Sequence, residues 1–242
     1  MTGPVLQISG VSKDYRGLRP LRLQQLTVGA GEHIAILGLD QVSAEVFVNL
    51  VTGATLPDGG EIRVFGRATS DIADSADWLS TVDRFGIVSE RAVLLDGLAV
   101  IQNLAMPFTL DIEPPPDDVR QMAERLAQEV RLPEPLWTAR VAELDPAARV
   151  RVRLARALAM NPAVLLLEHV SAALPADVTL RFGAELRAIA AHRGVAIVAA
   201  TADEAFARAV AVRVLALDPA TGRLAERSRG RWFERLGRSG RH

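Results

Sequence analysis

Hydrophobic residues along the chain follow two alternating patterns. Short apolar runs at 33–37, 163–167 and 195–200 have the length and the continuity of strands that are buried on both faces. Over 117–130 the apolar residues return every three or four positions, which predicts an amphipathic helix, and a second long helix is predicted at 176–192. This alternation of strands and helices predicts an α/β fold.

Shorter elements complete the pattern. Further strands are predicted at 5–9, 21–28, 61–65 and 84–88, and residues 212–227 predict two edge strands joined at Pro219–Gly222. A helix is predicted at 43–52, directly after the strand that ends before Gly38.

The stretch 149–154 alternates arginine with apolar residues and has the period of a strand. Asp145 suits a helix N-cap and Pro146 suits the first helical position, so we predict a helix there. We expect the arginines of this helix to face solvent rather than an acidic partner; they are Arg149, Arg151, Arg153 and Arg156.

Composition narrows the classes of function. The 242 residues carry 28 basic and 29 acidic side chains, a balance that argues against a nucleic-acid-binding protein. The chain has no cysteine, which excludes disulfides and thiolate metal sites, and its four histidines are too scattered for a zinc cluster. Lys13 is the only lysine. With no apolar run as long as a membrane span and no signal-like N-terminus, we predict a cytoplasmic protein.

A series of landmarks resembles the ATP-binding subunit of an ABC transporter, from Leu6 to about Leu224. Tyr15 stands where the family has its adenine-stacking aromatic residue, and Phe85–Val88 is similar to the strand before the Q-loop. Further matches are the turn Gly53–Glu61, the stretch Leu98–Pro107, and Leu154–Leu158 followed by Asn161 and Pro162.

The resemblance implies a P-loop NTPase-like ABC ATPase core of α/β class, with antiparallel N-terminal strands and a helical subdomain. We expect one domain at 1–227, with the helical subdomain inserted at about 91–160. The remaining segment, 228–242, is a basic tail with interleaved apolar residues, which is either a docking helix for a membrane surface or partner, or a frayed terminus.

The phosphate-loop motif of this family is degenerate here. A phosphate loop uses glycine backbone N–H groups, a lysine on the β- and γ-phosphates, and a hydroxyl on Mg²⁺. Of the motif glycines only Gly38 remains, Ala44 replaces the lysine and Glu45 replaces the hydroxyl residue. The vestigial nucleotide-binding positions are Tyr15, Gly38, Asp40, Ser43, Ala44, Glu45, Val46 and, in the Q-loop, Glu90. We predict that Asp40, Ser43 and Glu45 fill the loop and satisfy the helix N-terminus in place of phosphate.

The other motifs are altered in the same way. The signature sequence has become Leu144, Asp145, Pro146, Ala147 and Ala148, which lacks both glycines, and Pro146 has no N–H. Glu168 stands at the Walker B carboxylate, His169 at the catalytic glutamate and Ala202 at the switch histidine. Loss of a general base alone slows an enzyme by about 10²–10⁴; here the lysine and the metal-binding hydroxyl are missing as well.

These losses predict a pseudo-ATPase with no catalytic residues, no metal site and no expected cofactor, so that ATP and Mg²⁺ are relevant only if the altered site still binds them. Through the resemblance we expect a transmembrane permease and a second ABC ATPase subunit, in a hetero- or homodimer, as partners. The protein would then lie in the cytoplasm, peripherally at the inner face of the cell membrane.

Two other hypotheses of function stay open. One is a subunit that still binds or hydrolyses ATP, with His169 as general base and Glu168 at the metal; the other is a stand-alone interaction protein on the same fold. At single residues, Tyr15 is either an adenine platform or an ordinary half-buried tyrosine, and Asp40 with Glu45 either a cation site or part of a helix cap.

Overall fold

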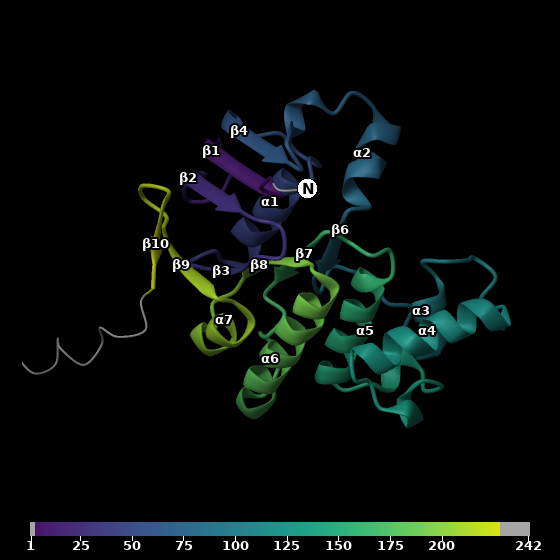
Figure 1. Cartoon of the computed structure of the whole chain (residues 1–242). Helices are drawn as coiled ribbons and strands as arrows, with labels where there is room; N and C mark the ends of the chain where they lie inside the picture. Colours follow the sequence, from purple (N-terminus) through teal and green to yellow (C-terminus); the bar gives the residue numbers. More distant parts are fainter. Residues whose placement is uncertain (1–2, 228–242) are drawn as a thin grey trace, which may run out of the picture.

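The computed structural model describes residues 3–227 and contains two β-sheets with helices packed around them (Figure 1). The first sheet is antiparallel, with strand order β2-β1-β4-β5. The second has the order β10-β9-β3-β8-β7-β6 and is parallel apart from β10. This arrangement confirms the predicted α/β class and the antiparallel N-terminal strands.

The elements have the following bounds. The strands are β1 (Leu6–Lys13), β2 (Leu21–Val28), β3 (His33–Leu37), β4 (Gly59–Val64), β5 (Arg67–Ala68), β6 (Phe85–Val88), β7 (Val164–Glu168), β8 (Ala196–Ala200), β9 (Arg213–Asp218) and β10 (Arg223–Glu226). The α-helices are α1 (Gln41–Val51), α2 (Ser75–Val82), α3 (Val100–Ala105), α4 (Asp117–Glu129), α5 (Pro146–Leu158), α6 (Ala176–Arg193) and α7 (Glu204–Val210). Short 3₁₀ turns lie at Thr69–Asp71, Glu134–Leu136 and Val141–Glu143.

The central strands β3, β7 and β8 are buried along their whole length, as their continuous apolar sequences predict. Because successive side chains point to opposite faces, each strand serves two cores. On β7, Leu165 and Leu167 join the helix-covered core, whereas Val164 and Leu166 join the core below the antiparallel sheet. The sheet therefore separates the two hydrophobic cores of the molecule.

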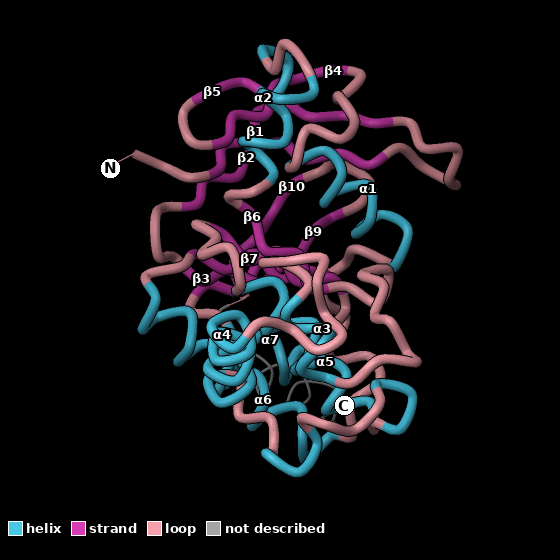
Figure 2. The backbone as a smooth tube through the Cα atoms, turned by 90° about the vertical axis from the view of Figure 1, so that its right-hand side faces the viewer, coloured by secondary structure: helices cyan, strands magenta, loops and turns pink. Residues whose placement is uncertain are grey.

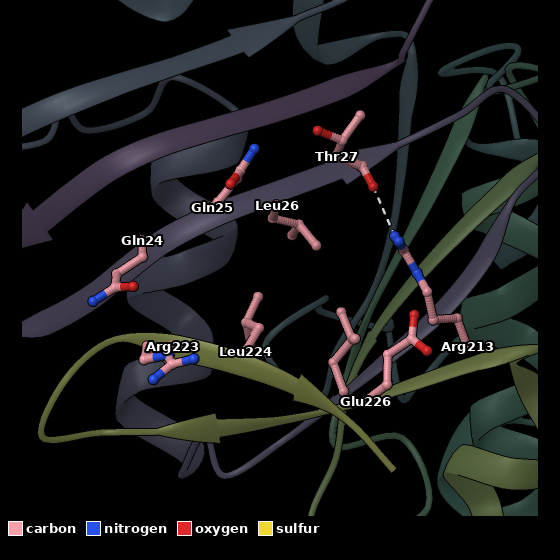
Figure 3. A pocket seen from close by; sticks show the side chains of 9 residues that line it. Gln24, Gln25, Leu26, Thr27, Arg213, Arg223, Leu224 and Glu226 are labelled. Atoms are coloured by element: carbon pink, nitrogen blue, oxygen red, sulfur yellow. Dashed lines mark hydrogen bonds between the residues drawn. The ribbon is translucent and has the colours of Figure 1, made fainter. Parts of the chain in front are cut away.

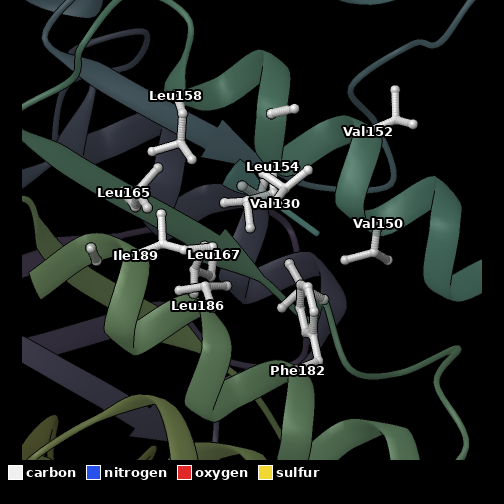
Figure 4. Close-up of a cluster of buried hydrophobic side chains, with 14 of the residues drawn as sticks. Val130, Val150, Val152, Leu154, Leu158, Leu165, Leu167, Phe182, Leu186 and Ile189 are labelled. Atoms are coloured by element: carbon white, nitrogen blue, oxygen red, sulfur yellow. The ribbon is translucent and has the colours of Figure 1, made fainter. Parts of the chain in front are cut away.

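Helices α3, α4 and α5 contact one another beside β6, and most helices gather on one side of the six-stranded sheet (Figure 2). Their apolar faces join the sheet and α6 in one buried cluster. Figure 4 shows part of that cluster, where Leu154 and Leu158 of α5 lie near Leu165 of β7. Gly86 on β6 permits this packing, because a Cβ there would lie 2.4 Å from the carbonyl oxygen of Ala157.

At the opposite end, strand β10 lies against β2 of the other sheet. The N–H of Gln24 donates to the carbonyl of Gly222 at 2.8 Å, and Arg213 Nη2 donates to the carbonyl of Thr27 at 2.7 Å. A hollow of about 370 Å³ lies between these strands (Figure 3). The prediction of two edge strands was wrong for β9, which pairs with β3 on one side and β10 on the other.

The long elements agree with the hydrophobic pattern, including the helix α5 with Asp145 as its N-cap. Helix α2 was not predicted; it buries none of its residues, so its sequence lacks a clear apolar stripe. The short helices α3 and α7 were also missed. No helix in the described part of the chain combines the length and the apolar character that a membrane crossing requires. The tail at 228–242 lies outside the described residues.

Candidate functional site

The segment between β3 and α1 is much shorter than a phosphate loop. Only Gly38, Leu39 and Asp40 separate the two elements, because the helix already begins at Gln41. Gly38 has φ +98°, and a Cβ there would meet the carbonyl oxygen of Leu217 at 2.9 Å, so the turn requires glycine. The positions that would cradle phosphate, 41–45, are helical instead.

Asp40 is the N-cap of α1. Its Oδ1 accepts the backbone N–H of Ser43 at 2.7 Å and the Ser43 hydroxyl at 2.6 Å. These hydrogen bonds from Ser43, first from its side chain and then from its backbone, hold the pKa of Asp40 below its usual range. The predicted capping role of Asp40 is therefore confirmed, whereas Ser43 donates to the cap and does not itself accept a helix N–H. A side-chain carboxylate already takes the N–H that a phosphate would need.

Ala44, at the lysine position, is fully buried in the first turns of α1 and packs into the core with Phe47 and Val48. No amine is present there to contact a phosphate. Val42, in the first turn of the same helix, is 55% exposed. Val46 is half-buried on the same helix and packs against the core.

Glu168 ends β7 with a side chain that is 0% exposed. Its carboxylate is held by Arg91, whose Nη2 lies 2.8 Å from Oε2 and whose Nε lies 3.2 Å from Oε1. Gln41 Nε2 donates to the same Oε1 at 3.2 Å. Glu168, at the Walker B position, is thus the buried member of an ion pair.

Glu45 does not fill the loop or cap α1, which corrects the prediction. Its Oε1 instead accepts from Nη1 of Arg91 at 3.1 Å, on a part of the surface where both side chains are about 40% exposed. Arg91 was not identified as a site residue. The signal that was available is that acids stand at the metal-binding positions of two separate motifs, Glu45 in the phosphate loop and Glu168 in Walker B, and two acids at one site need a cation.

His169 follows Glu168 in the left-handed region, with φ +47°. Its backbone N–H donates to the carbonyl of Ala200, while its Nε2 is buried and has no hydrogen-bond partner among the described residues. It lines a hollow of about 370 Å³ with Ser171, Thr201 and Ala202. Glu90, at the Q-loop position, is exposed.

The signature stretch lies far along the chain, before α5. Asp145 accepts the N–H of Ala148 at 2.7 Å, and Pro146 occupies the first turn of the helix. Leu144 and Ala148 are buried, whereas Asp145 and Pro146 are exposed and Ala147 is half-buried. This helix start, like that of α1, is capped by its own aspartate.

Tyr15 is half-buried at the edge of a cavity of about 660 Å³ that reaches Gly38, Asp40 and Ser43. Arg16, with Arg19 and Arg22 beyond it, lines the same cavity. Partial burial, and then the charge of Asp40, raise the pKa of the Tyr15 phenol above its usual value. An aromatic ring and cations therefore stand beside the capped helix start.

The arginines of α5 do not face open solvent, which corrects the sequence-based expectation. Arg156 donates to the carbonyl of Val93 at 2.6 Å, and Arg153 donates to the carbonyl of Ala92 at 3.4 Å. Arg149 pairs with Asp96 at 3.1 Å. The segment between β6 and α3 is consequently attached to α5. Arg151 turns inward to Glu185 instead.

The chain belongs to the ABC transporter family. The family model described as "ABC transporter" matches residues 21–170. The methionine import ATP-binding protein MetN of Brucella abortus (strain 2308) is 29% identical over 218 residues, covering 90% of this chain and 58% of that protein. The lipoprotein-releasing system ATP-binding protein LolD of Anaeromyxobacter dehalogenans is 29% identical, covering 83% of this chain and 85% of its own. The chain thus spans a little over half the length of the methionine import relative.

Solved structures show the same fold. The chain is similar to cbiO1 from Clostridium perfringens, part of an ABC transporter complex, with a TM-score of 0.77 and 21% identity, covering 92% of this chain and 87% of that one. A dimeric ATP-binding cassette, MJ0796, bound to ADP and Pi has a TM-score of 0.74 and 22% identity, covering 92% and 99%. The P-loop NTPase-like ABC cassette predicted from the sequence is therefore confirmed as the fold.

The fold family implies Mg²⁺ and ATP, and the residues present do not fit the metal ion. The carboxylate oxygens that would face a cation, on Glu168 and Glu45, are already bonded to the guanidinium of Arg91. Among residues 3–227, no group of acidic, histidine or cysteine side chains is arranged to hold a metal ion. The buried Ala44 likewise offers nothing to the phosphates.

Proposed function

We propose that the protein is a catalytically degenerate ABC ATP-binding subunit that serves as a structural or regulatory partner. Its partners would be a membrane permease and a second ABC subunit with an intact ATPase site, in ATP-driven transport at the inner face of the cell membrane. The observation that carries the proposal is the start of α1, where Ala44 is buried and Asp40 accepts the N–H that phosphate would need.

Retention of the rest of the fold supports a role that depends on shape. Both sheets, both cores and helices α3–α5 are present, and the segment at 89–98 is firmly attached to α5. The names of the relatives, methionine import and lipoprotein release among them, point to different cargoes. We therefore propose a transporter subunit without specifying its cargo. The part of the chain that would serve this role is one domain, 1–227, with its helical subdomain at about 91–160.

Calorimetric titration of the purified chain with Mg²⁺-ATP, up to millimolar concentration, tests the proposal. We expect no binding heat and no phosphate release, whereas an ABC subunit with an intact Gly-rich loop and lysine, measured alongside, binds. Phosphate release that is lost in Glu168→Ala or His169→Ala would contradict the proposal and favour a working ATPase. Co-expression with the permease should carry the chain to the membrane fraction; a chain that stays in the supernatant favours a stand-alone interaction protein.

A second candidate function is nucleotide binding without hydrolysis, which the cavity beside Tyr15 favours. Its volume of about 660 Å³ and its three arginines suit an aromatic base with an anionic group. Titration with ATP in the presence of EDTA tests this reading, with Tyr15→Ala as the variant. Binding that is independent of metal and at least tenfold weaker in Tyr15→Ala would support it.

A further inference from the structure

The side chain of Glu168 is completely buried, so a charge on it needs a partner within the protein. Arg91 provides that partner in a two-point contact, with Nη2 and Nε directed at the two carboxylate oxygens at 2.8 and 3.2 Å. No other basic side chain among the described residues forms an ion pair with Glu168. The carboxylate therefore depends on a single cation.

The third nitrogen of the same guanidinium extends the contact to another element. Nη1 of Arg91 lies 3.1 Å from Oε1 of Glu45 on α1. One planar group therefore bridges the end of β7, the beginning of α1 and the segment after β6, and it uses all three of its nitrogens to do so. This fork geometry is available to arginine and not to lysine.

The segment that carries Arg91 is also held from its far side. Within the segment, the backbone N–H of Arg91 donates to the hydroxyl of Ser89 at 3.1 Å. From α3, the side-chain amide of Asn103 accepts from the backbone N–H of Leu95 and donates to the carbonyl of Leu95. Arg156 of α5 donates to Val93. Residues 89–96 are thus fastened to the sheet at one point and to α3 and α5 at others.

We propose that Arg91 is a built-in cation that takes the place of a divalent metal ion at Glu168 and fastens residues 89–96 to the sheet without any ligand. The site therefore binds no divalent cation while Arg91 is present. The inference rests on the contacts of Arg91 and goes beyond the proposed function, since a subunit of any role can carry it. A failed ATP-binding test and a failed Arg91 test are consequently separate results.

Thermal unfolding of the full chain with Arg91→Met, in excess EDTA and in millimolar MgCl₂, tests the inference. Wild type should have the same Tm in both buffers. Breaking a buried ion pair should lower the Tm of Arg91→Met by roughly 10 °C in EDTA, and Mg²⁺ should restore part of the loss because Glu168 and Glu45 are then free. Arg120→Met, which removes an exposed pair with Glu124, should change Tm by no more than about 2 °C.

Two more variants keep the test decisive. Adding Glu168→Gln to Arg91→Met should recover much of the lost Tm, since no buried charge remains to be neutralised. Arg91→Lys keeps the charge but not the fork, and it should fold with a smaller loss, which covers the case in which Arg91→Met does not fold. Hydrogen exchange of amides 89–96 should be faster in Arg91→Lys and unchanged by Mg²⁺ in wild type.

Three results would overturn the inference. They are a Tm of wild type that rises with Mg²⁺, a loss in Arg91→Met no larger than in Arg120→Met, and a loss that neither Mg²⁺ nor the added Glu168→Gln reduces. The first would show that the guanidinium leaves room for a metal. The other two would show that Arg91 does not serve as the cation of Glu168.

Discussion

Glu168 and Glu185 are two well-buried carboxylates that are neutralised in different ways. Glu168, at the end of β7, is 0% exposed and pairs with Arg91, which is 40% exposed. Glu185, in the middle of α6, is 11% exposed and lies among several arginines. Its partners are Arg151 at 2.6 Å, Arg131 at 3.1 Å and Arg181 at 4.0 Å.

The two sites differ in which charged group is buried and needs the other as its counter-ion. At Glu168 the carboxylate is the buried member and has one cation. At Glu185 the cation Arg151 is itself only 10% exposed, and it also donates to the carbonyl of Val130 at 2.6 Å. The comparison teaches that a buried acid does not by itself mark a catalytic site, because the same ion-pair chemistry joins two helices elsewhere in this molecule.

Among the variants that test this comparison, the largest expected effect comes from Glu185→Gln. It leaves the positive charge of Arg151 buried without a counter-ion, which should cost about 3 kcal/mol of unfolding free energy, measured by urea denaturation. The matched variant Glu168→Gln should cost about 1 kcal/mol or less, since Arg91 keeps Glu45 and contact with water. Equal losses in the two variants would erase the difference between the sites.

The pH dependence of stability should also distinguish the Glu185 cluster. Burial by itself raises the pKa of Glu185, but the hydrogen bond and charge of Arg151, with the charge of Arg131, outweigh it and hold that pKa below its ordinary value. The unfolded chain therefore takes up the proton first, at a pKa of about 4.3, so the stabilisation is present above that pH and lost as pH falls through the lower folded pKa. Wild type should lose unfolding free energy below about pH 4 more steeply than Glu185→Gln; parallel curves would contradict this.

The capping aspartates should have intermediate effects. Asp145→Ala removes the acceptor for Ala148 N–H at the start of α5, and Asp40→Ala removes the acceptor for Ser43 at the start of α1. Each should lower the unfolding free energy by about 1 kcal/mol, measured by urea denaturation, because a helix cap is a surface hydrogen bond. Asp40→Ala should still bind no Mg²⁺-ATP in calorimetry, since Ala44 stays buried; binding in this variant would mean that the cap alone closes the site.

The smallest effect is expected for Arg131→Met. Arg131 is 62% exposed, and Glu185 keeps Arg151 when it is removed. The loss should be no more than about 0.5 kcal/mol in the same urea measurement. A loss as large as that of Glu185→Gln would mean that the three arginines act as one unit.

Much of the fold could be read from the pattern of apolar residues. The buried strands β3, β7 and β8 and the long helices α4 and α6 follow directly from continuous or periodic hydrophobic runs. Helix α2 could not be found in this way, because it buries no residue and so leaves no periodic signal. The position of β9 inside the sheet depends on which strands pair, and local sequence does not specify that.

The candidate site, like the fold, has features that the sequence predicts and features that only the tertiary structure shows. The sequence by itself determined that a lysine is absent at Ala44, that Pro146 has no N–H and that Asp40 and Asp145 suit helix caps, because these are properties of residue type and local spacing. Only the tertiary structure decided that Arg91, out of so many arginines, meets Glu168, which is 77 positions away. Electrostatic partners at such separations are chosen by how sheets and helices pack, and that information is not contained in any local segment of the chain.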